Sequence, residues 1–248
     1  MNETPQPSGS GVETADVETS SDGYAARFAG PAGTWMLSVQ ERIVLGWAAE
    51  HPGASVLDVG GGHGQVAVPL GKRGYRVTVL GSAPACAQRL QPDIDAGRLA
   101  FTTGDLLALP SPDRSFDIVI SLRLLPHCEQ WRTLVGELCR VAQHCVIVDY
   151  PTTRSINCLT SALFGAKKRL EGNTRSYALF HHAEVSAEFA RHGFTLAARR
   201  PQFLLPMVLH RVLNRPRLSA FLEGIGRGFG LTRFFGSPVL VKMVRRDG

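Results

Sequence analysis

The sequence predicts an α/β protein built on an open, mostly parallel sheet with helices on both faces. Three observations indicate this class. A glycine-rich turn joins a buried strand to a helix between residues 55 and 72. Apolar strands then alternate with segments of helical spacing along the rest of the chain. The length of 248 residues and the apolar content of 44% suit one domain of this class with a sizeable core.

The glycine-rich turn is the stretch around which the chain is organised. It reads Val-Leu-Asp-Val-Gly-Gly-Gly-His-Gly over residues 56–64, and a helix is expected over residues 65–72. Glycines tolerate positive φ and place no side chain in the way of a ligand, while the first amides of a helix favour anionic or polar groups. The pattern therefore predicts a nucleotide cradle, although a glycine-rich strand-to-helix turn without a ligand is the alternative.

Asp58 extends this pattern to Asp-x-Gly-x-Gly-x-Gly. The run resembles the first motif of the class I S-adenosylmethionine-dependent methyltransferases. The resemblance implies that Gly60, Gly62 and Gly64 lie against the methionine part of the cofactor, and that Asp58 holds its amino group. It also implies a seven-stranded, doubly wound, Rossmann-like sheet whose last strand is antiparallel, with helical lid insertions. Small methyltransferases related to the quinone C-methylating enzymes are the most similar group.

Composition divides the chain into a tail and one domain. Residues 1–22 hold five acids, no Lys or Arg and no aromatic residue, and they are rich in Ser, Thr, Gly and Pro. Such a segment cannot bury enough apolar surface to fold, so we expect a disordered acidic tail. The methyltransferase-like domain is expected over residues 23–248, with insertions at about 151–180 and 203–236.

The remaining elements follow from apolar runs and helical spacing. Strands are expected at residues 55–58, 76–80, 99–103, 116–121, 144–150, 195–200 and 238–244, and helices at 35–47, 128–142 and 182–192. Before the first strand, residues 24–28 form a Tyr-x-x-x-Phe segment. In many small methyltransferases such a segment closes over the cofactor, so Tyr24 is either a lid residue or a core residue.

The end of the second strand departs from the resemblance. The family usually places an acid there to hold the ribose hydroxyls, whereas this chain has Gly81 followed by Ser82. Ser82 can replace the acid weakly, at a loss of about 1–3 kcal/mol in cofactor binding. Otherwise an acid comes from elsewhere in the chain, or the nucleotide differs. A small residue there also suits NADP, so an NADP-dependent reductase is an alternative. A methyltransferase-like binding subunit without catalysis is another.

The third strand leads into Gly-Asp and a short loop ending in Leu-Pro at residue 110. By the resemblance, Asp105 accepts a hydrogen bond from the adenine amino group and Leu106 lies against the ring. The alternative is that Asp105 only caps its own turn. Ser121, at the end of the fourth strand, completes the cofactor-binding set that the resemblance implies.

Candidate acceptor residues follow the next strand ends. Arg123 and His127 come just after the carboxyl end of the strand at 116–121, where open α/β sheets bind ligands. His127 can act as a general base or can cap the next helix. Tyr150 ends the fifth strand on the same side, and Arg175 in the insertion can meet an anionic acceptor. We therefore predict methyl transfer from S-adenosylmethionine to a small-molecule or lipid-like acceptor, with the accepting atom left open.

Other patterns restrict the partners. The five cysteines form no Cys-x-x-Cys pair and the eight histidines form no metal pattern, so we expect reduced thiols and no metal site. No signal peptide and no apolar run of about twenty residues is present, which favours the cytoplasm. The run Asp-Tyr-Pro at residues 149–151 differs from the signature of amino-methylating DNA enzymes, which disfavours nucleic acid. The oligomeric state is not indicated.

The segment 206–235 interleaves apolar residues with five arginines. Such a segment is either a lid over the acceptor pocket or an interfacial element that touches a membrane surface. Two prolines and four glycines break it into short pieces, which favours the lid.

Overall fold

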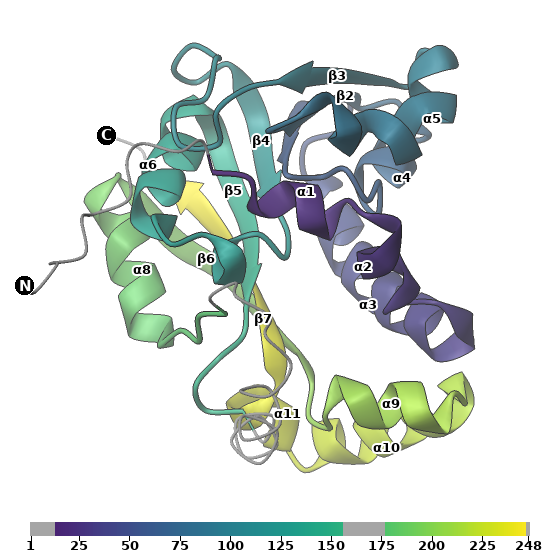
Figure 1. Cartoon of the computed structure of the whole chain (residues 1–248). Coiled ribbons are helices and arrows are strands. Elements are labelled where there is room, and N and C mark those ends of the chain that lie inside the picture. The colour runs from purple at the N-terminus through teal and green to yellow at the C-terminus, as the bar shows by residue number, and fades with distance from the viewer. Residues whose placement is uncertain (1–12, 156–176, 247–248) are drawn as a thin grey trace, which may run out of the picture.

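A computed structural model describes residues 13–155 and 177–246 (Figure 1). Its centre is a seven-stranded sheet in the order β3-β2-β1-β4-β5-β7-β6. The strands are β1 (Ser55–Val59), β2 (Arg76–Gly81), β3 (Leu99–Thr103), β4 (Phe116–Ser121), β5 (Ala142–Tyr150), β6 (Phe194–Phe203) and β7 (Ser237–Arg245). Strand β7 pairs antiparallel with both β5 and β6, while the other pairs are parallel. The predicted fold class is confirmed.

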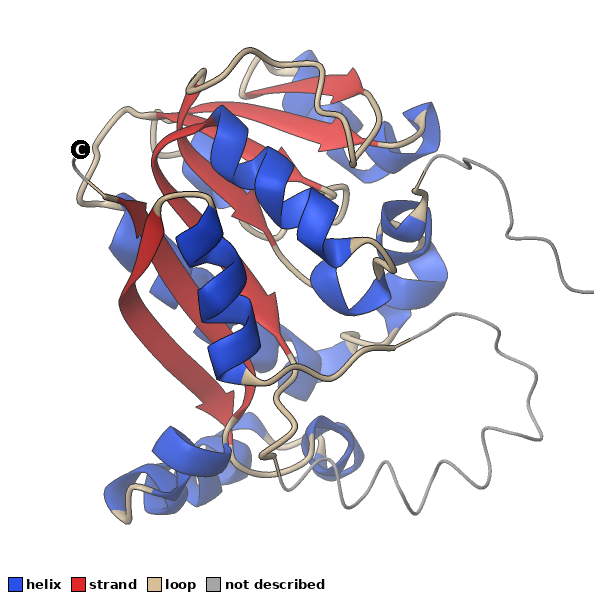
Figure 2. Ribbon diagram, turned by 90° about the vertical axis from the view of Figure 1, so that its left-hand side faces the viewer, coloured by secondary structure: helices blue, strands red, loops and turns tan. Residues whose placement is uncertain are grey.

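Helices lie on both faces of this sheet (Figure 2). The α-helices are α1 (Ala15–Thr19), α2 (Asp22–Ala26), α3 (Gly30–Ala48), α4 (Ala67–Gly71), α5 (Gln91–Asp95), α6 (Trp131–Val141), α8 (His182–Arg191), α9 (Met207–Leu213), α10 (Pro216–Gly228) and α11 (Leu231–Phe235). Two 3₁₀ turns, η1 (Pro84–Leu90) and η2 (Leu125–His127), follow β2 and β4. The segment between β6 and β7 forms three short helices, because Pro206 and Pro216 stand at the starts of α9 and α10, and Gly230 separates α10 from α11.

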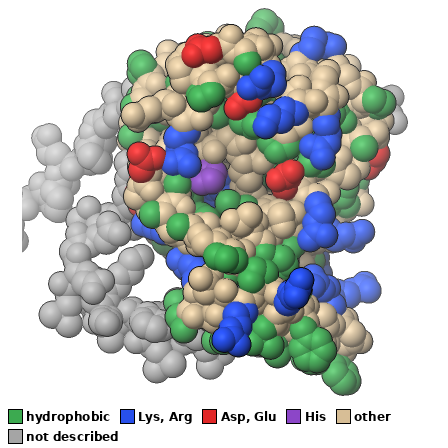
Figure 3. Space-filling model, turned by 90° about the vertical axis from the view of Figure 1, so that its right-hand side faces the viewer, with side chains coloured by type: hydrophobic (Ala, Val, Ile, Leu, Met, Phe, Trp, Pro, Cys, Tyr) green, Lys and Arg blue, Asp and Glu red, His purple; other side chains and the backbone are tan. Residues whose placement is uncertain are grey.

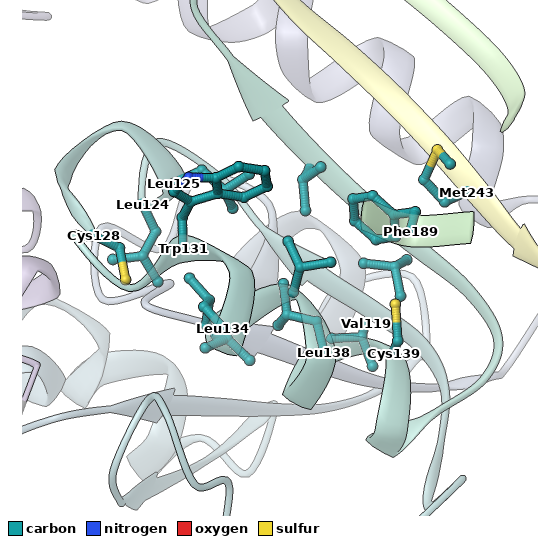
Figure 4. Close-up of a cluster of buried hydrophobic side chains, with 14 of the residues drawn as sticks. Val119, Leu124, Leu125, Cys128, Trp131, Leu134, Leu138, Cys139, Phe189 and Met243 are labelled. Atoms are coloured by element: carbon teal, nitrogen blue, oxygen red, sulfur yellow. The ribbon is translucent and has the colours of Figure 1, made fainter. Parts of the chain in front are cut away.

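The core has one layer on each face of the sheet. Leu134 and Leu138 of α6 pack with Phe189 and Met243 in one buried cluster (Figure 4). A second cluster on the other face joins residues of α3 and α4, such as Trp47, to alternate residues of β1 and β4. The central strands are thus buried on both sides, as parallel strands covered by helices must be.

The N-terminal segment differs from the prediction. Residues 13–22 form α1 and the start of α2, and the side chains of Ala15, Asp16 and Thr19 are buried. The expected disorder is therefore wrong for residues 13–22. Composition predicts disorder here because it treats an acid such as Asp16 as solvated. The Asp16 carboxylate instead accepts hydrogen bonds inside the protein, as described below.

Some expectations fall outside the described residues. Arg175 and Cys158 belong to the segment 156–176, as does most of the expected insertion at 151–180. In the described part of the chain the other four cysteines are free and buried. No helix among residues 13–155 and 177–246 is long and apolar enough to cross a membrane.

Candidate functional site

The turn after β1 can be built only from glycine. Gly60 and Gly64 have φ of 74° and 72°, a region that side chains disfavour. The Gly60 amide donates to the Leu80 carbonyl at 2.8 Å, which fixes the turn on β2. A Cβ on Gly61 would overlap the carboxyl group of Asp58, and one on Gly62 would lie 2.5 Å from the carbonyl oxygen of Cys86. The turn therefore folds closely over Asp58.

Asp58 is a buried acid beside several polar atoms without partners. Its side chain is 2% exposed, and burial raises its pKa to about 7 although the Arg123 charge lowers it. In the described residues, Ser20 Oγ, both ring nitrogens of His63 and Arg123 Nε are buried without a hydrogen-bond partner. Buried polar atoms are nearly always paired in folded proteins. A ligand that carries amino, carboxylate and hydroxyl groups fits these residues.

Gly81 leaves no room for the acid that the resemblance would place there. A Cβ on Gly81 would lie 2.7 Å from Cys86 Cβ and 3.1 Å from the ring of Phe101. The next residue, Ser82, instead donates its backbone amide and its hydroxyl to Asp16, at 2.6 and 2.5 Å. The Cys86 thiol also lies 3.2 Å from Asp16 Oδ2. A carboxylate thus stands at the end of β2, but α1 supplies it.

Helix α1 lies directly over the glycine turn. A Cβ on Gly62 would overlap the Ser20 hydroxyl, and one on Gly60 would lie 3.4 Å from Asp16 Cβ. Gly60, Gly62 and Gly64 are all buried beneath this segment. Figure 1 shows α1 near the centre of the molecule, beside the sheet. The side chains of Asp16 and Ser20 therefore lie against the glycine turn in this conformation.

The residues expected at the adenine lie around the ends of β3 and β4. The Asp105 carboxylate accepts the Leu107 amide at 2.8 Å, as expected for the turn alternative. Leu106 is fully buried in the core. The Ser121 hydroxyl donates to the carbonyl of Val59 at 3.1 Å, which ties the end of β4 to β1. The polar groups of Asp105 and Ser121 thus make hydrogen bonds within the fold, and Leu106 is part of the core.

A cavity of about 580 Å³ opens beside this region. Its size is typical of small-molecule sites. Its walls come from α2, α3, η2, α9 and the adjoining ends of β5, β6 and β7, and they are largely apolar, with Phe28, Met36, Leu37, Pro126, Phe203, Met207 and Val208. The glycine turn does not line this cavity. Figure 3 shows the molecule hollowed on the face seen there, above a part rich in hydrophobic and basic side chains.

Arg123 joins the cavity to the glycine turn. It has a φ of 60°, unusual for a residue with a side chain, and the Asp149 carboxylate holds its amide at 2.5 Å. The guanidinium group donates to the side-chain oxygen of Gln65 and lies 5.4 Å from the ring of Phe28 and 5.9 Å from that of Tyr24. Strained residues of this kind concentrate at functional sites.

Of the two alternatives for Tyr24, the structure shows the core position, and its role over the cofactor stays a prediction. It is 8% exposed, so it belongs to the core, and it also lines the cavity. Burial raises the pKa of its hydroxyl, which therefore stays protonated. Its ring and that of Phe28, with centroids 5.7 Å apart, lie beside the Arg123 guanidinium in the same wall.

Two polar wall residues were not predicted as site residues. Asp149 is 2% exposed and accepts a hydrogen bond from Gln40 Nε2 at 2.7 Å, and burial raises its pKa. Arg211 of α9 adds a second cation to the wall. Gln40 could have been found, because it is a polar residue within the buried stripe of α3. Nothing in the sequence around Arg211 distinguishes it from the other arginines of the segment.

His127 and Tyr150 both lie in the cavity wall, where their predicted roles stay predictions. The ring of His127 is half-buried, 5.5 Å from that of Tyr177. The Tyr150 hydroxyl shares a hydrogen bond of 2.5 Å with His182 Nδ1, so it is already engaged. Among the described residues no cluster of His, Cys, Asp and Glu could hold a metal ion.

Sequence comparisons bear on this geometry. Residues 56–144 match a family described as a methyltransferase domain. Over 230 residues the chain is 29% identical to a malonyl-[acyl-carrier protein] O-methyltransferase of Serratia marcescens, covering 89% of this chain and 83% of that protein. Over 97 residues it is 37% identical to a 2-methyl-6-phytyl-1,4-hydroquinone methyltransferase of Synechocystis, covering 37% of this chain and 30% of that protein.

Structural comparison agrees on the fold. A magnesium protoporphyrin IX methyltransferase from Synechocystis, crystallised with bound SAH, superposes with a TM-score of 0.64 over 92% of this chain and 96% of that one. The two sequences are 18% identical in that superposition. The likeness therefore concerns the sheet and its helices, which are the parts that carry the glycine turn.

Proposed function

Because this chain belongs to the S-adenosylmethionine-dependent methyltransferases, we propose that it transfers the cofactor's methyl group to a small, largely apolar acceptor held in the cavity. The cavity is the main observation that supports this proposal. It lies at the carboxyl ends of β4 and β5, where open sheets bind their ligands, and its wall is apolar except for a few polar groups. The relatives' names, which include a phytyl hydroquinone and a porphyrin, support an acceptor of this kind.

The residues of the glycine turn fit the cofactor. S-adenosylmethionine supplies a methyl group that is already activated by the sulfonium, so the protein mainly has to position the two reactants. Asp58, once ionised, is the acceptor for the amino group, and Arg123 Nε and the single ring N–H of neutral His63 are donors for the carboxylate. Binding requires α1 to leave the turn, since Ser20 and Asp16 fill that space.

The cavity residues have separate tasks in this proposal. Arg123 and Arg211 place positive charge in the wall, which suits an acceptor with one anionic or acidic group. The rings of Tyr24 and Phe28 separate the cavity from water on the α2 side. His127 takes the proton of a hydroxyl acceptor, and base assistance of this kind is worth about 10²–10⁴ in rate.

Calorimetry with S-adenosylhomocysteine (SAH) tests the cofactor part of the proposal. We expect the wild-type chain to bind SAH and not NADPH. The variants Asp58→Asn and Gly62→Val should bind SAH at least tenfold more weakly, because one removes the charge and the other fills the cradle. Asp95→Asn, an exposed acid of α5, is the matched control. Binding of NADPH without SAH would refute the proposal.

The role of His127 is tested once the acceptor is known. Mass spectrometry of metabolites from cells with and without the gene identifies the methylated product. With that acceptor, His127→Ala should lower kcat by about 10²–10⁴, with little change in KM and with loss of the acidic limb of the pH profile. A fully retained rate would remove the base from the mechanism and leave positioning alone.

A second candidate function is a binding subunit without catalysis. The observation that favours it is α1, which fills the cofactor groove in the described conformation. The two candidates differ in one result. If Asp58→Asn and Gly62→Val leave the cellular activity of the protein intact, the cofactor is not used and the binding subunit is the function.

A further inference from the structure

The three helices between β6 and β7 bury polar and small side chains and expose apolar ones. Their buried side chains are polar or small: His210 of α9, Ser219, Glu223 and Gly226 of α10, and Thr232 of α11. Many of their large apolar side chains are exposed, although Met207, Leu213 and Leu222 are half-buried. Val212, Phe221, Phe229 and Phe234 are 77, 64, 78 and 63% exposed. A surface helix of a globular protein has the opposite arrangement.

The inner contacts fix this orientation. The Glu223 carboxylate is fully buried and accepts the amides of Leu204 and Leu205 at 2.8 and 2.9 Å and His210 Nε2 at 3.0 Å. At the end of α9, the Asn214 side chain accepts the Ala32 amide at 3.3 Å. Rotating α9 or α10 to bury its apolar face would leave these buried groups without partners, which is strongly unfavourable. The outward apolar face is thus built into the fold.

The charge on this face has one sign. Residues 206–235 contain five arginines, at 211, 215, 217, 227 and 233, and all five are exposed. Their one acid is Glu223, which is buried. Figure 3 shows basic and hydrophobic side chains side by side on the lower part of the molecule. Exposed phenylalanines among arginines match a lipid headgroup boundary, which offers apolar depth and anionic phosphates together. A nucleic acid would use the arginines but would leave the apolar residues in water.

The apolar face also continues into the acceptor cavity. Met207, Val208 and Arg211 of α9 line the cavity, and Val208 and Arg211 are at the same time part of the exposed face. We propose that the outer face of α9–α11 docks on an anionic bilayer and that the acceptor enters the cavity from there. The docking stands on the surface alone, while the acceptor's entry rests on the proposed function. An apolar acceptor would then reach the cavity without crossing water.

Vesicle sedimentation of the full chain tests the docking. We expect binding to phosphatidylcholine vesicles that contain phosphatidylglycerol, weaker binding at high salt, and little binding to phosphatidylcholine alone. The pair Arg217→Ala and Arg227→Ala should weaken binding about 25-fold, since each arginine near an anionic surface is worth about fivefold. The pair Phe221→Ser and Phe229→Ser should weaken it at least tenfold.

Matched controls lie elsewhere on the surface. Arg73→Ala, just after α4, and Leu196→Ser on β6 change an exposed arginine and an exposed leucine away from these helices, and should leave vesicle binding unchanged. SAH binding serves as the folding check for every variant. If it is kept while vesicle binding is lost, the docking surface is supported separately from the cofactor site.

Three results would overturn the docking proposal. One is no binding to anionic vesicles by the folded chain. Another is binding that the patch variants and the control variants change equally. The third is a wild-type oligomer that dissociates in the Phe221→Ser and Phe229→Ser variant, which would make a second copy of the chain the occupant of this face.

Discussion

Replacing Asp16 by alanine removes the carboxylate that ties α1 to the end of β2. In the described conformation this carboxylate accepts the amide and the hydroxyl of Ser82 at 2.6 and 2.5 Å. Because α1 lies against the glycine turn, where we propose that the cofactor binds, loosening α1 should raise the fraction of molecules that can bind the cofactor. We therefore expect Asp16→Ala to bind SAH more tightly than the wild type.

The size of the effect follows from those two contacts. A hydrogen bond to a charged group is worth about 1.5–3 kcal/mol, and water partly replaces the carboxylate at Ser82 in the variant. We therefore take about 1.5–3 kcal/mol for the pair, which corresponds to about 10- to 150-fold in affinity. Asp16→Asn, which keeps the shape and loses the charge, should give a smaller gain in the same direction.

Isothermal titration with SAH measures this gain. Asp22→Ala is the matched control on the same segment, because its carboxylate is 86% exposed and meets only the Arg89 side chain at 2.5 Å. An exposed ion pair is worth at most about 1 kcal/mol, so the control should change the affinity less than about fivefold. Weaker SAH binding by a folded Asp16→Ala variant would refute the reasoning. It would mean that Asp16 contacts the bound cofactor, in the role that the family usually gives to an acid at the end of β2.

Three further substitutions test separate parts of the structure. Asp58→Asn should stabilise the fold by up to about 4 kcal/mol near pH 8 and hardly near pH 4. The reason is that a buried carboxyl whose pKa is raised to about 7 destabilises the protein once it ionises. Urea unfolding at both pH values measures the difference, and equal effects at the two pH values would contradict it. Gly81→Ala should cost about 1–3 kcal/mol, and Gly81→Asp should not tighten SAH binding, since a Cβ there meets Cys86 and Phe101. Glu223→Ala should destabilise the chain by about 3–5 kcal/mol in thermal unfolding, because the buried donors that Glu223 accepts from are left without a partner. An unchanged stability would show that α10 can rotate about its axis.

The first half of the domain was predictable because its signals are local. The turn at residues 60–64 needs glycine for its backbone, so the sequence itself marks the place of the site. The strands at 99–103 and 116–121 match β3 and β4 in both bounds, since apolar runs between turn residues leave little choice. Arg123 and His127 were predicted from their place just after a strand, because the carboxyl ends of the strands in an open sheet lie at its ligand-binding edge.

The other features of the site could not be predicted from the sequence, because they depend on contacts between distant segments. Asp16 lies 66 residues from Ser82, and nothing in its acidic surroundings marks it as buried. The same holds for the pairing of Gln40 with Asp149 across 109 residues. In the segment 206–235 the apolar residues could be identified, but the side they face depends on what Glu223 binds inside. A pattern of apolar residues alone predicts the opposite orientation.

The place of β7 in the sheet has a consequence for how such a protein changes over evolutionary time. Strands β6 and β7 are antiparallel neighbours, so the chain leaves the sheet after Phe203 and returns to the same end at Ser237. A segment whose two ends meet can be exchanged, lengthened or shortened without moving the register of any strand. The glycine turn, which lies on β1 at a distance in both sequence and sheet order, is untouched by such exchanges. The proposed docking face and the part of the cavity wall that α9 supplies can therefore be inherited as one replaceable module, while the glycine turn stays constant.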